Sequence, residues 1–273
     1  MSMSNITLTS GMRQNLFSLQ QTSSLMESTQ TRLSSGKKVN SALDDPINFF
    51  AAQGHTQRAS DLSMRKDEMS EAIQTIKAAD NGISAVTDMI AAAKSLAQSA
   101  LATNDTGERA TLATQYESMI DQIDLLVDDS GYKGTNLLDG TGVSIVVSFD
   151  ESGESALTVQ GVDGKGGLDE TAAANGSWAT EANITADIAL LDTARDALRT
   201  SAKTLSNQLS TITTRQEFTS KMINTLEDGA ANLVNADLNE EGANMLMLQT
   251  RQSLGTTSLS LASQAAQSVM RLF

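Results

Sequence analysis

The sequence predicts a mainly α-helical protein: an elongated antiparallel helical rod or coiled coil with one small β-hairpin and with its termini paired at one end. Three observations support this prediction. The chain of 273 residues contains a single proline, where about a dozen are usual. Aromatic residues make up only 3% of the chain, which leaves little material for a compact globular core. Apolar residues recur at heptad-like spacing along most of its length.

The single proline stands where a helix is expected to begin. Proline is tolerated in the first turn of a helix, where its missing N–H has no partner. Asp45 precedes it and can cap the free N–H groups of that turn. We therefore expect a helix to begin at Pro46, after a glycine break at Gly36. The absence of any later proline favours long helices in the rest of the chain.

The first predicted helix ends at Gly36 and carries an apolar stripe with polar insertions. Lys37 and Lys38 follow it and suit the negative end of a helix dipole. The stripe consists of Met12, Leu16, Leu19, Ser23, Met26, Gln30 and Leu33.

Three further helices are expected in the middle of the chain. The spacing of apolar residues predicts helices over 46–101, 107–129 and 185–226. The first of them would span roughly 80 Å at 1.5 Å per residue. That length exceeds the diameter of an ordinary domain and indicates a rod.

One block, residues 131–183, lacks helical spacing. Two β-rich runs, 143–149 and 156–162, flank a polar turn and predict a β-hairpin over 143–162. The Gly-rich segment 163–183 is expected to be a short variable loop.

A second break is expected over 227–237, before a final helix that reaches the C-terminus. A second face of this helix carries Met247, Leu254 and Leu261. Two apolar faces on one helix imply burial on two sides, so we expect partner helices to cover them. The main face consists of Val234, Leu238, Met245, Leu248, Leu259, Ala262, Ala266, Val269 and Phe273.

Composition excludes several classes of function. The net charge of −14 argues against nucleic acid, whose binding needs clustered Lys and Arg, and against anionic membranes. Without cysteine, neither disulfides nor thiolate metal sites exist. No apolar run reaches the 18 or so residues of a membrane helix. The N-terminal sequence lacks the pattern of a cleaved signal peptide, so we expect a cytoplasmic protein or one exported without such a signal.

No residue pattern indicates catalysis, a metal or a cofactor. His55 is the only histidine, and its polar neighbours form no recognisable ligand or catalytic set. The acidic pairs at 128–129 and 150–151 do not follow a calcium-loop pattern, and the segment 164–167 is not a P-loop. We therefore expect no enzyme activity. Four Asn-X-Ser/Thr triplets match a pattern that arises by chance in Ser/Thr-rich chains.

Three segments resemble bacterial flagellins. LSSGKKVNSALDDP (33–46) is similar to the N-terminal signature of that family. The C-terminal helix, which closes with SVMRLF (268–273), resembles the flagellin C-terminus. YKGTNLLDG (132–140) matches the turn that precedes the hairpin in the family. The resemblance covers nearly the whole chain, and its paired terminal signatures are specific.

The resemblance implies a subunit that polymerises into the extracellular flagellar filament for swimming motility. Residues 1–35 and 234–273 would form an inner coiled coil, 36–45 and 227–233 two spoke links, and 46–226 a rod domain. The two terminal seams would then be polymerisation contacts, with Leu259 and Phe273 in contacts between subunits. The spoke and helix start would consist of Gly36, Asp44, Asp45 and Pro46. With so short a loop at 163–183, the chain resembles a minimal flagellin.

The same resemblance implies partners and an export route. It implies type III export without a cleaved signal, a cytoplasmic export chaperone at the C-terminal helix, and hook-associated junction and cap proteins as neighbours. Two alternatives stay open. One is a hook-filament junction protein of the same family. The other is a flagellin-like cell-surface protein that binds glycans, which the low aromatic content disfavours.

Many flagellins are recognised by an innate immune receptor that binds the flank of the long rod helix. The resemblance places that surface around 86–101 and the facing helix near 109–120. Receptor-binding members carry an arginine-rich stretch there, whereas this chain reads AAAKSLAQ over 91–98.

Few charged groups remain on that surface. No arginine lies between Arg65 and Arg109, and Lys94 lacks the planar fork that lets arginine bind bidentately. Glu117 does resemble a family contact residue. We therefore expect weak or absent receptor recognition.

Overall fold

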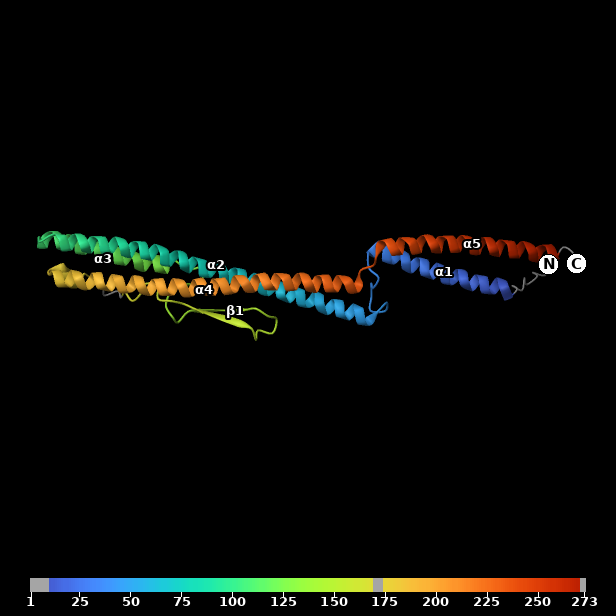
Figure 1. Ribbon diagram of the computed structural model, residues 1–273, viewed down its shortest axis with the longest axis horizontal. Helices are drawn as coiled ribbons and strands as arrows, with labels where there is room; N and C mark the ends of the chain where they lie inside the picture. The colour runs from blue at the N-terminus through green and yellow to red at the C-terminus, as the bar shows by residue number, and fades with distance from the viewer. Residues whose placement is uncertain (1–9, 169–173, 271–273) are drawn as a thin grey trace. The chain divides into compact units, whose positions relative to one another are not determined.

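The computed structural model describes residues 10–168 and 174–270 of the chain (Figure 1). This part contains five α-helices, one 3₁₀ turn and one two-stranded sheet. The predicted mainly helical fold with one small hairpin is confirmed. In chain order the elements are α1 (Ser10–Ser35), α2 (Pro46–Ala102), α3 (Thr106–Asp128), β1 (Ser144–Ser148), β2 (Ala156–Gln160), η1 (Asn175–Trp178), α4 (Glu181–Val234) and α5 (Leu238–Met270).

The chain divides into two compact units. The terminal unit comprises residues 1–57 and 225–273, and the central unit comprises residues 58–224. Both boundaries fall inside long helices, α2 and α4, rather than at the expected helix ends.

The start of α2 is the helix start that the sequence predicts. The helix begins at Pro46, and the Asp45 carboxylate accepts the backbone N–H of Asn48 at 3.1 Å and its side-chain amide at 2.6 Å. Asp105 caps α3 in the same way, through the backbone N–H of Gly107 at 2.7 Å. Acidic caps next to a proline or a turn therefore set where these helices begin.

The expected link at 227–233 is wrong, because α4 continues without interruption to Val234. Gly229 lies inside the helix, where a glycine costs only about 1 kcal/mol relative to alanine. Leu226 and Ala230 on either side of it are buried and continue the apolar face. The break falls instead at residues 235–237, where Asp237 accepts the backbone N–H of Asn239 and caps α5.

The other element boundaries differ from the predicted ones by smaller amounts. The strands β1 and β2 are each shorter than the predicted runs, and α3 is shifted by one residue. The expected loop over 163–183 contains η1 and the first residues of α4, while residues 169–173 lie outside the described part. Helix 4 begins at Glu181 rather than at 185, so the non-helical block is shorter than predicted.

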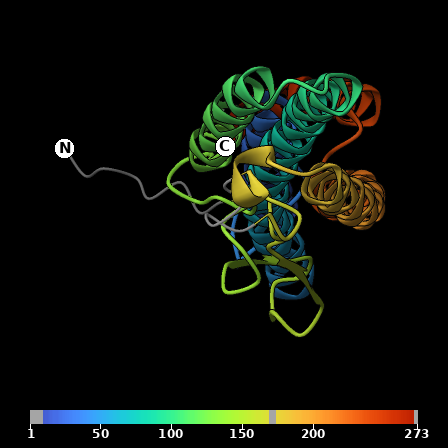
Figure 2. The same ribbon diagram turned by 90° about the vertical axis from the view of Figure 1, so that its left-hand side faces the viewer.

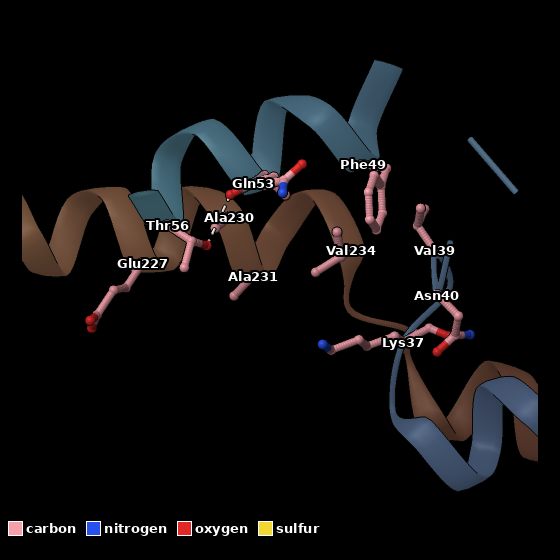
Figure 3. Close-up of a pocket in the computed structure, with 11 residues that line it drawn as sticks. Lys37, Val39, Asn40, Phe49, Gln53, Thr56, Glu227, Ala230, Ala231 and Val234 are labelled. Carbon is pink, nitrogen blue, oxygen red and sulfur yellow. Dashed lines mark hydrogen bonds between the residues drawn. The ribbon is translucent and has the colours of Figure 1, made fainter. Parts of the chain in front are cut away.

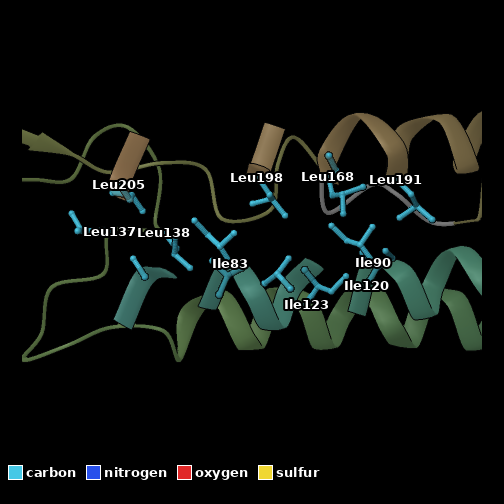
Figure 4. Close-up of a cluster of buried hydrophobic side chains, with 14 of the residues drawn as sticks. Ile83, Ile90, Ile120, Ile123, Leu137, Leu138, Leu168, Leu191, Leu198 and Leu205 are labelled. Carbon is cyan, nitrogen blue, oxygen red and sulfur yellow. The ribbon is translucent and has the colours of Figure 1, made fainter. Parts of the chain in front are cut away.

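The core of the central unit lies between α2, α3 and α4, which Figure 2 shows together with the hairpin in an end-on view. In Figure 4, isoleucines of α2 and α3 lie opposite leucines of α4, and Leu168 belongs to the same buried cluster. Apolar residues spaced by seven positions in α2 and α4 are buried here. They include Ile76, Ile83, Ile90 and Ala97 of α2 and Leu191, Leu198, Leu205 and Ile212 of α4.

The hairpin rests on the helices of the central unit. Its strands pair antiparallel, with Val147 opposite Leu157 and Ile145 opposite Val159. An isolated two-stranded hairpin is marginal in water, and here the Arg215 guanidinium lies 5.2 Å from the ring centre of Phe149. Val147 and Val159 are also buried, so the hairpin has packing that a lone hairpin lacks.

The only tryptophan anchors η1 to two helices. Trp178 is fully buried, and its ring centre lies 5.0 Å from that of Tyr116 on α3. Its indole N–H donates to Asp187 of α4 at 2.6 Å, and the backbone N–H of Asn175 donates to the same oxygen at 3.0 Å. This arrangement satisfies a buried carboxylate and ties the segment before α4 to α3.

Candidate functional site

The candidate site is the pair of terminal helices, α1 and α5, which run antiparallel within the terminal unit (Figure 1). At one end the Asn15 side-chain amide donates to the Ser258 hydroxyl at 3.1 Å. At the other end the Arg32 guanidinium donates to the Glu241 carboxylate at 3.2 Å. The start of α1 therefore lies beside the later turns of α5.

Two predicted positions of the α1 stripe are wrong. Ser23 and Gln30 are exposed, whereas Thr22 and Thr29 are buried. With Met26 they give 3-4 spacing, which the apolar pattern missed because threonine is a polar type. The Thr22 hydroxyl donates to the Ser18 carbonyl at 2.9 Å, which leaves its methyl group to pack.

The other predicted seam residues differ in exposure. Leu16 and Leu238 are exposed, and Val234 ends α4 and belongs to the link. The side chains of Ala266 and Val269, and residue Phe273, lie outside the described part. Leu248 is buried, and the half-buried seam residues are Met12, Leu19, Met26, Leu33, Met245, Leu259 and Ala262.

A glycine allows the two helices to approach closely. A Cβ atom at Gly255 of α5 would lie 2.5 Å from Cδ2 of Leu19 on α1. Real Cβ atoms do not make contacts this short, so an alanine there would displace the leucine or the helix. Sequence reasoning did not single out Gly255.

The outer face of α5 carries an apolar stripe that α1 does not cover. We call it the outer stripe: Met247, Leu254 and Leu261, which are spaced by seven residues and are 53%, 66% and 62% exposed. Phe17 and Leu25 of α1 are exposed as well. The helix pair thus keeps large apolar side chains on its outside, on the second face that the sequence predicted.

The link between α1 and α2 is held by backbone hydrogen bonds to the end of α4. The N–H groups of Lys38 and Val39 donate to the Val234 carbonyl at 2.7 and 3.2 Å. The N–H of Ala236 donates to the Gly36 carbonyl at 3.0 Å. Gly36 ends α1 with a φ of +69°, a left-handed conformation that glycine adopts without strain.

Asp44 closes the turn before α2. Its carboxylate accepts the backbone N–H groups of Ser41 and Asn40, each at 2.9 Å, and the Ser41 hydroxyl at 3.2 Å. These hydrogen bonds, led by the one from the Ser41 N–H, hold the pKa of Asp44 below its usual range. At neutral pH the carboxylate is ionised, and in that form it can accept all three hydrogen bonds.

A groove of about 410 Å³ lies between this link, the first turns of α2 and the last turns of α4 (Figure 3). We call it the link groove. Its apolar walls come from Val39, Phe49, Ala52, Ala230, Ala231 and Val234. Polar side chains stand around it: Lys37, Asn40, Gln53, Thr56 and Glu227.

The single histidine of the chain lies next to α4. His55 is half-buried beside Gly229 of α4. Within residues 10–168 and 174–270, no cluster of three or more His, Cys, Asp or Glu could hold a metal ion. Among the described helices, none is long and apolar enough to cross a membrane.

Comparisons with known proteins point to one family. The family model for the bacterial flagellin N-terminal helical region matches residues 5–142. The flagellin FljM of Caulobacter vibrioides is 28% identical over 277 aligned residues that cover all of both chains. A flagellin of Brucella melitensis is 27% identical over 94% of this chain and 95% of its own. The crystal structure of Bacillus cereus flagellin aligns with 56% of this chain and 88% of its own, at 18% identity and a TM-score of 0.48.

Proposed function

Since this chain belongs to the bacterial flagellin family and is a structural subunit of the flagellar filament, we propose that the α1–α5 pair is the element through which it polymerises. The observation that supports this proposal is the outer stripe on α5. One face of α5 already contacts α1, yet the opposite face presents Met247, Leu254 and Leu261 to solvent. In a filament, neighbouring copies would cover that face.

The free energy of burying the outer stripe favours polymerisation through the α1–α5 pair. Burying one leucine or methionine side chain contributes about 1.5 to 3 kcal/mol, so three of them give a strong drive to associate. The contact between α1 and α5 has few buried apolar residues of its own: Leu248 is buried, while Thr22 and Thr29 fill the facing positions on α1. The pair is therefore better suited to a larger bundle of helices than to standing alone.

The exposed surface of the terminal helices also suggests which other proteins the subunit contacts. The filament is extracellular, and we propose that the subunit leaves through the type III channel. The outer stripe on α5 is apolar and would be exposed before export. We propose that a cytoplasmic chaperone binds it there. Junction and cap proteins would contact the same terminal helices at the filament ends. We infer that the subunit has no enzyme activity, in keeping with a structural family.

We further propose that recognition by the innate immune receptor is weak or absent. Lys94 is engaged by Asp192, at 2.6 and 2.8 Å from its two carboxylate oxygens. Arg109 is buried, and its Nε donates to the carbonyls of Ala100 and Thr103. These contacts support the proposal, because both cations already have partners within the chain and would have to exchange them to bind a receptor.

Glu117, the residue that resembles a family contact, is also engaged. Its carboxylate accepts the backbone N–H of Ala174 at 3.1 Å. A receptor group would have to compete with that internal hydrogen bond, which supports weak recognition.

Seeded elongation of purified subunits tests the polymerisation element. Leu261→Asp places a charge in the outer stripe without touching the α1–α5 seam, and we expect it to abolish elongation. Ser260→Asp adds the same charge one residue away on an exposed polar position and should elongate normally. Normal filaments from Leu261→Asp would contradict the proposal. Electron microscopy of the wild type addresses the alternatives, because a junction protein gives short assemblies and a glycan binder stays monomeric.

A further inference from the structure

We propose that Leu43, Ile47 and Phe50 of one subunit dock into the link groove of a second copy of the same chain. We call these three residues the corner patch. The inference rests on the proposed function, because a filament subunit needs contacts that repeat from copy to copy. It adds a contact that is separate from the outer stripe of α5.

The corner patch is exposed and is held in place. Leu43, Ile47 and Phe50 are 96%, 81% and 60% exposed. They lie on the turn before α2 and on its first turns, which the Asp44 and Asp45 carboxylates fix through backbone hydrogen bonds. Contiguous exposed apolar side chains often mark a surface that a partner covers. The corner patch is such a surface.

The link groove has the size and lining to receive this patch. Its volume is about 410 Å³, and an apolar cavity of about 150 Å³ holds one benzene-sized group. The groove therefore has room for two or three side chains of the size of leucine or phenylalanine. Val39, Phe49 and Val234 supply apolar walls (Figure 3).

The patch cannot fill the groove of its own chain. The residues of α2 that line the groove, Phe49, Ala52, Gln53 and Thr56, follow the 3-4 spacing of one helix face. Ile47 and Phe50 project from the other side of the same helix. The rings of Phe49 and Phe50 meet edge to face, with centres 5.5 Å apart, so the patch begins next to the groove wall but lies on a different face of the helix.

A patch and a complementary groove on different sides of one molecule make a head-to-tail contact. Such a contact does not close on itself in pairs, and it generates rings or open helical assemblies. A helical filament requires contacts of this kind, which is why the occupant we assign is a second copy rather than another protein.

Charge supports the same pairing and sets its direction. Asp44 is exposed beside Leu43 in the patch, and Lys37 is exposed at one end of the groove. Glu227 stands among the other groove residues on α4. Docking with Asp44 toward Lys37 brings opposite charges together, whereas docking with Asp44 toward Glu227 brings like charges together.

Disulfide cross-linking tests the contact directly, because the chain has no cysteine of its own. Ile47→Cys and Ala231→Cys are made in separate subunits, mixed in equal amounts, polymerised and oxidised. We expect a dimer band on a non-reducing gel that neither variant gives alone. Met64→Cys, exposed on α2 in the central unit, replaces Ile47→Cys in the control mixture and should give no such band. Filaments of the first mixture without the dimer band would overturn the inference.

A second measurement uses a variant that keeps its fold. In Ile47→Ser with Phe50→Ser, two exposed side chains change, so circular dichroism and thermal unfolding should match the wild type. Elongation from wild-type seeds should slow at least tenfold, while Val146→Ser, which is exposed on β1, should elongate normally. Wild-type elongation by the double variant would overturn the docking proposal alone. Failure of the wild-type chain to form filaments would overturn the proposed function and this inference with it.

Discussion

The Arg32 guanidinium on α1 donates to the Glu241 carboxylate on α5 over 3.2 Å. The two side chains differ in exposure, at 40% for Arg32 and 9% for Glu241. A carboxylate this deeply buried needs its partner, because an unpaired buried charge is strongly destabilising. The pair therefore fixes the last turn of α1 against the first turn of α5.

Arg32→Ala should loosen the terminal helix pair. It leaves the Glu241 carboxylate without compensation, at a cost of about 1 to 2 kcal/mol for a pair that is partly open to solvent. Hydrogen exchange at backbone amides of α1 and α5 should then be faster by roughly 5- to 30-fold.

Arg65→Ala is the matched control for this prediction. Arg65 pairs with Glu68 on the surface of α2, three residues away on the same helix, and such pairs contribute about 0 to 1 kcal/mol. Unchanged exchange in α1 and α5 of Arg32→Ala would show that the buried carboxylate is compensated by another group.

Mild proteolysis of the free subunit should remove the terminal helices first and leave a core near residues 46–226. The reason is the thin contact between α1 and α5, whose backbone opens more readily than that of the three-helix core. In filaments the same helices should resist the protease. Mass spectrometry of the fragments tests this, and equal protection in both forms would refute the assignment of the helix pair to subunit contacts.

Acid should destabilise the central unit below about pH 4. The Lys94 ammonium, with a smaller contribution from Arg195, holds the pKa of Asp192 below its usual range. A carboxylate whose pKa is lowered on folding stabilises the protein above its unfolded value, near 4, and this stabilisation is lost as the pH falls through the folded value. Hydrogen bonds from Lys133 and Ser152 lower the pKa of Glu71 and of Asp150 in the same direction.

Thermal unfolding of Lys94→Met against pH isolates the contribution of Asp192. The variant should unfold at a lower temperature than the wild type at pH 7, and the two midpoints should converge as Asp192 is protonated in acid. A difference that stays constant down to pH 2 would mean that Lys94 acts through packing rather than through its charge.

Much of this fold follows from local sequence signals. Pro46 with Asp45 marks the start of α2, Gly36 marks the end of α1, and the heptad positions from Ile76 to Ala97 form the buried face of α2. These signals succeed because capping, left-handed glycine and apolar periodicity each depend on a few neighbouring residues.

Other features depend on contacts distant in sequence. Gly229 looks like a break but lies inside α4, because buried neighbours outweigh its weak helix propensity. Thr22 and Thr29 are polar by type, yet they form the buried face of α1 once α5 lies against it. The role of Gly255 needs the position of Leu19, which the sequence alone does not supply.

Purified monomer should activate the innate immune receptor weakly beside an arginine-bearing flagellin. Loss of a hot-spot arginine commonly costs 2 kcal/mol or more, roughly thirtyfold in affinity. Here Lys94 is paired with Asp192 and Arg109 is buried. A receptor-reporter assay over a range of concentrations tests this, and equal potency of the two proteins would refute it.

A cryo-electron microscopy map of the filament tests the central claim most directly. We predict that Met247, Leu254 and Leu261 of α5 are covered by helices of neighbouring subunits, while Leu248 keeps its contact with α1 of the same chain. A map in which these three side chains face solvent, with the subunits joined only through the central unit, would contradict the assignment of the α1–α5 pair as the polymerisation element.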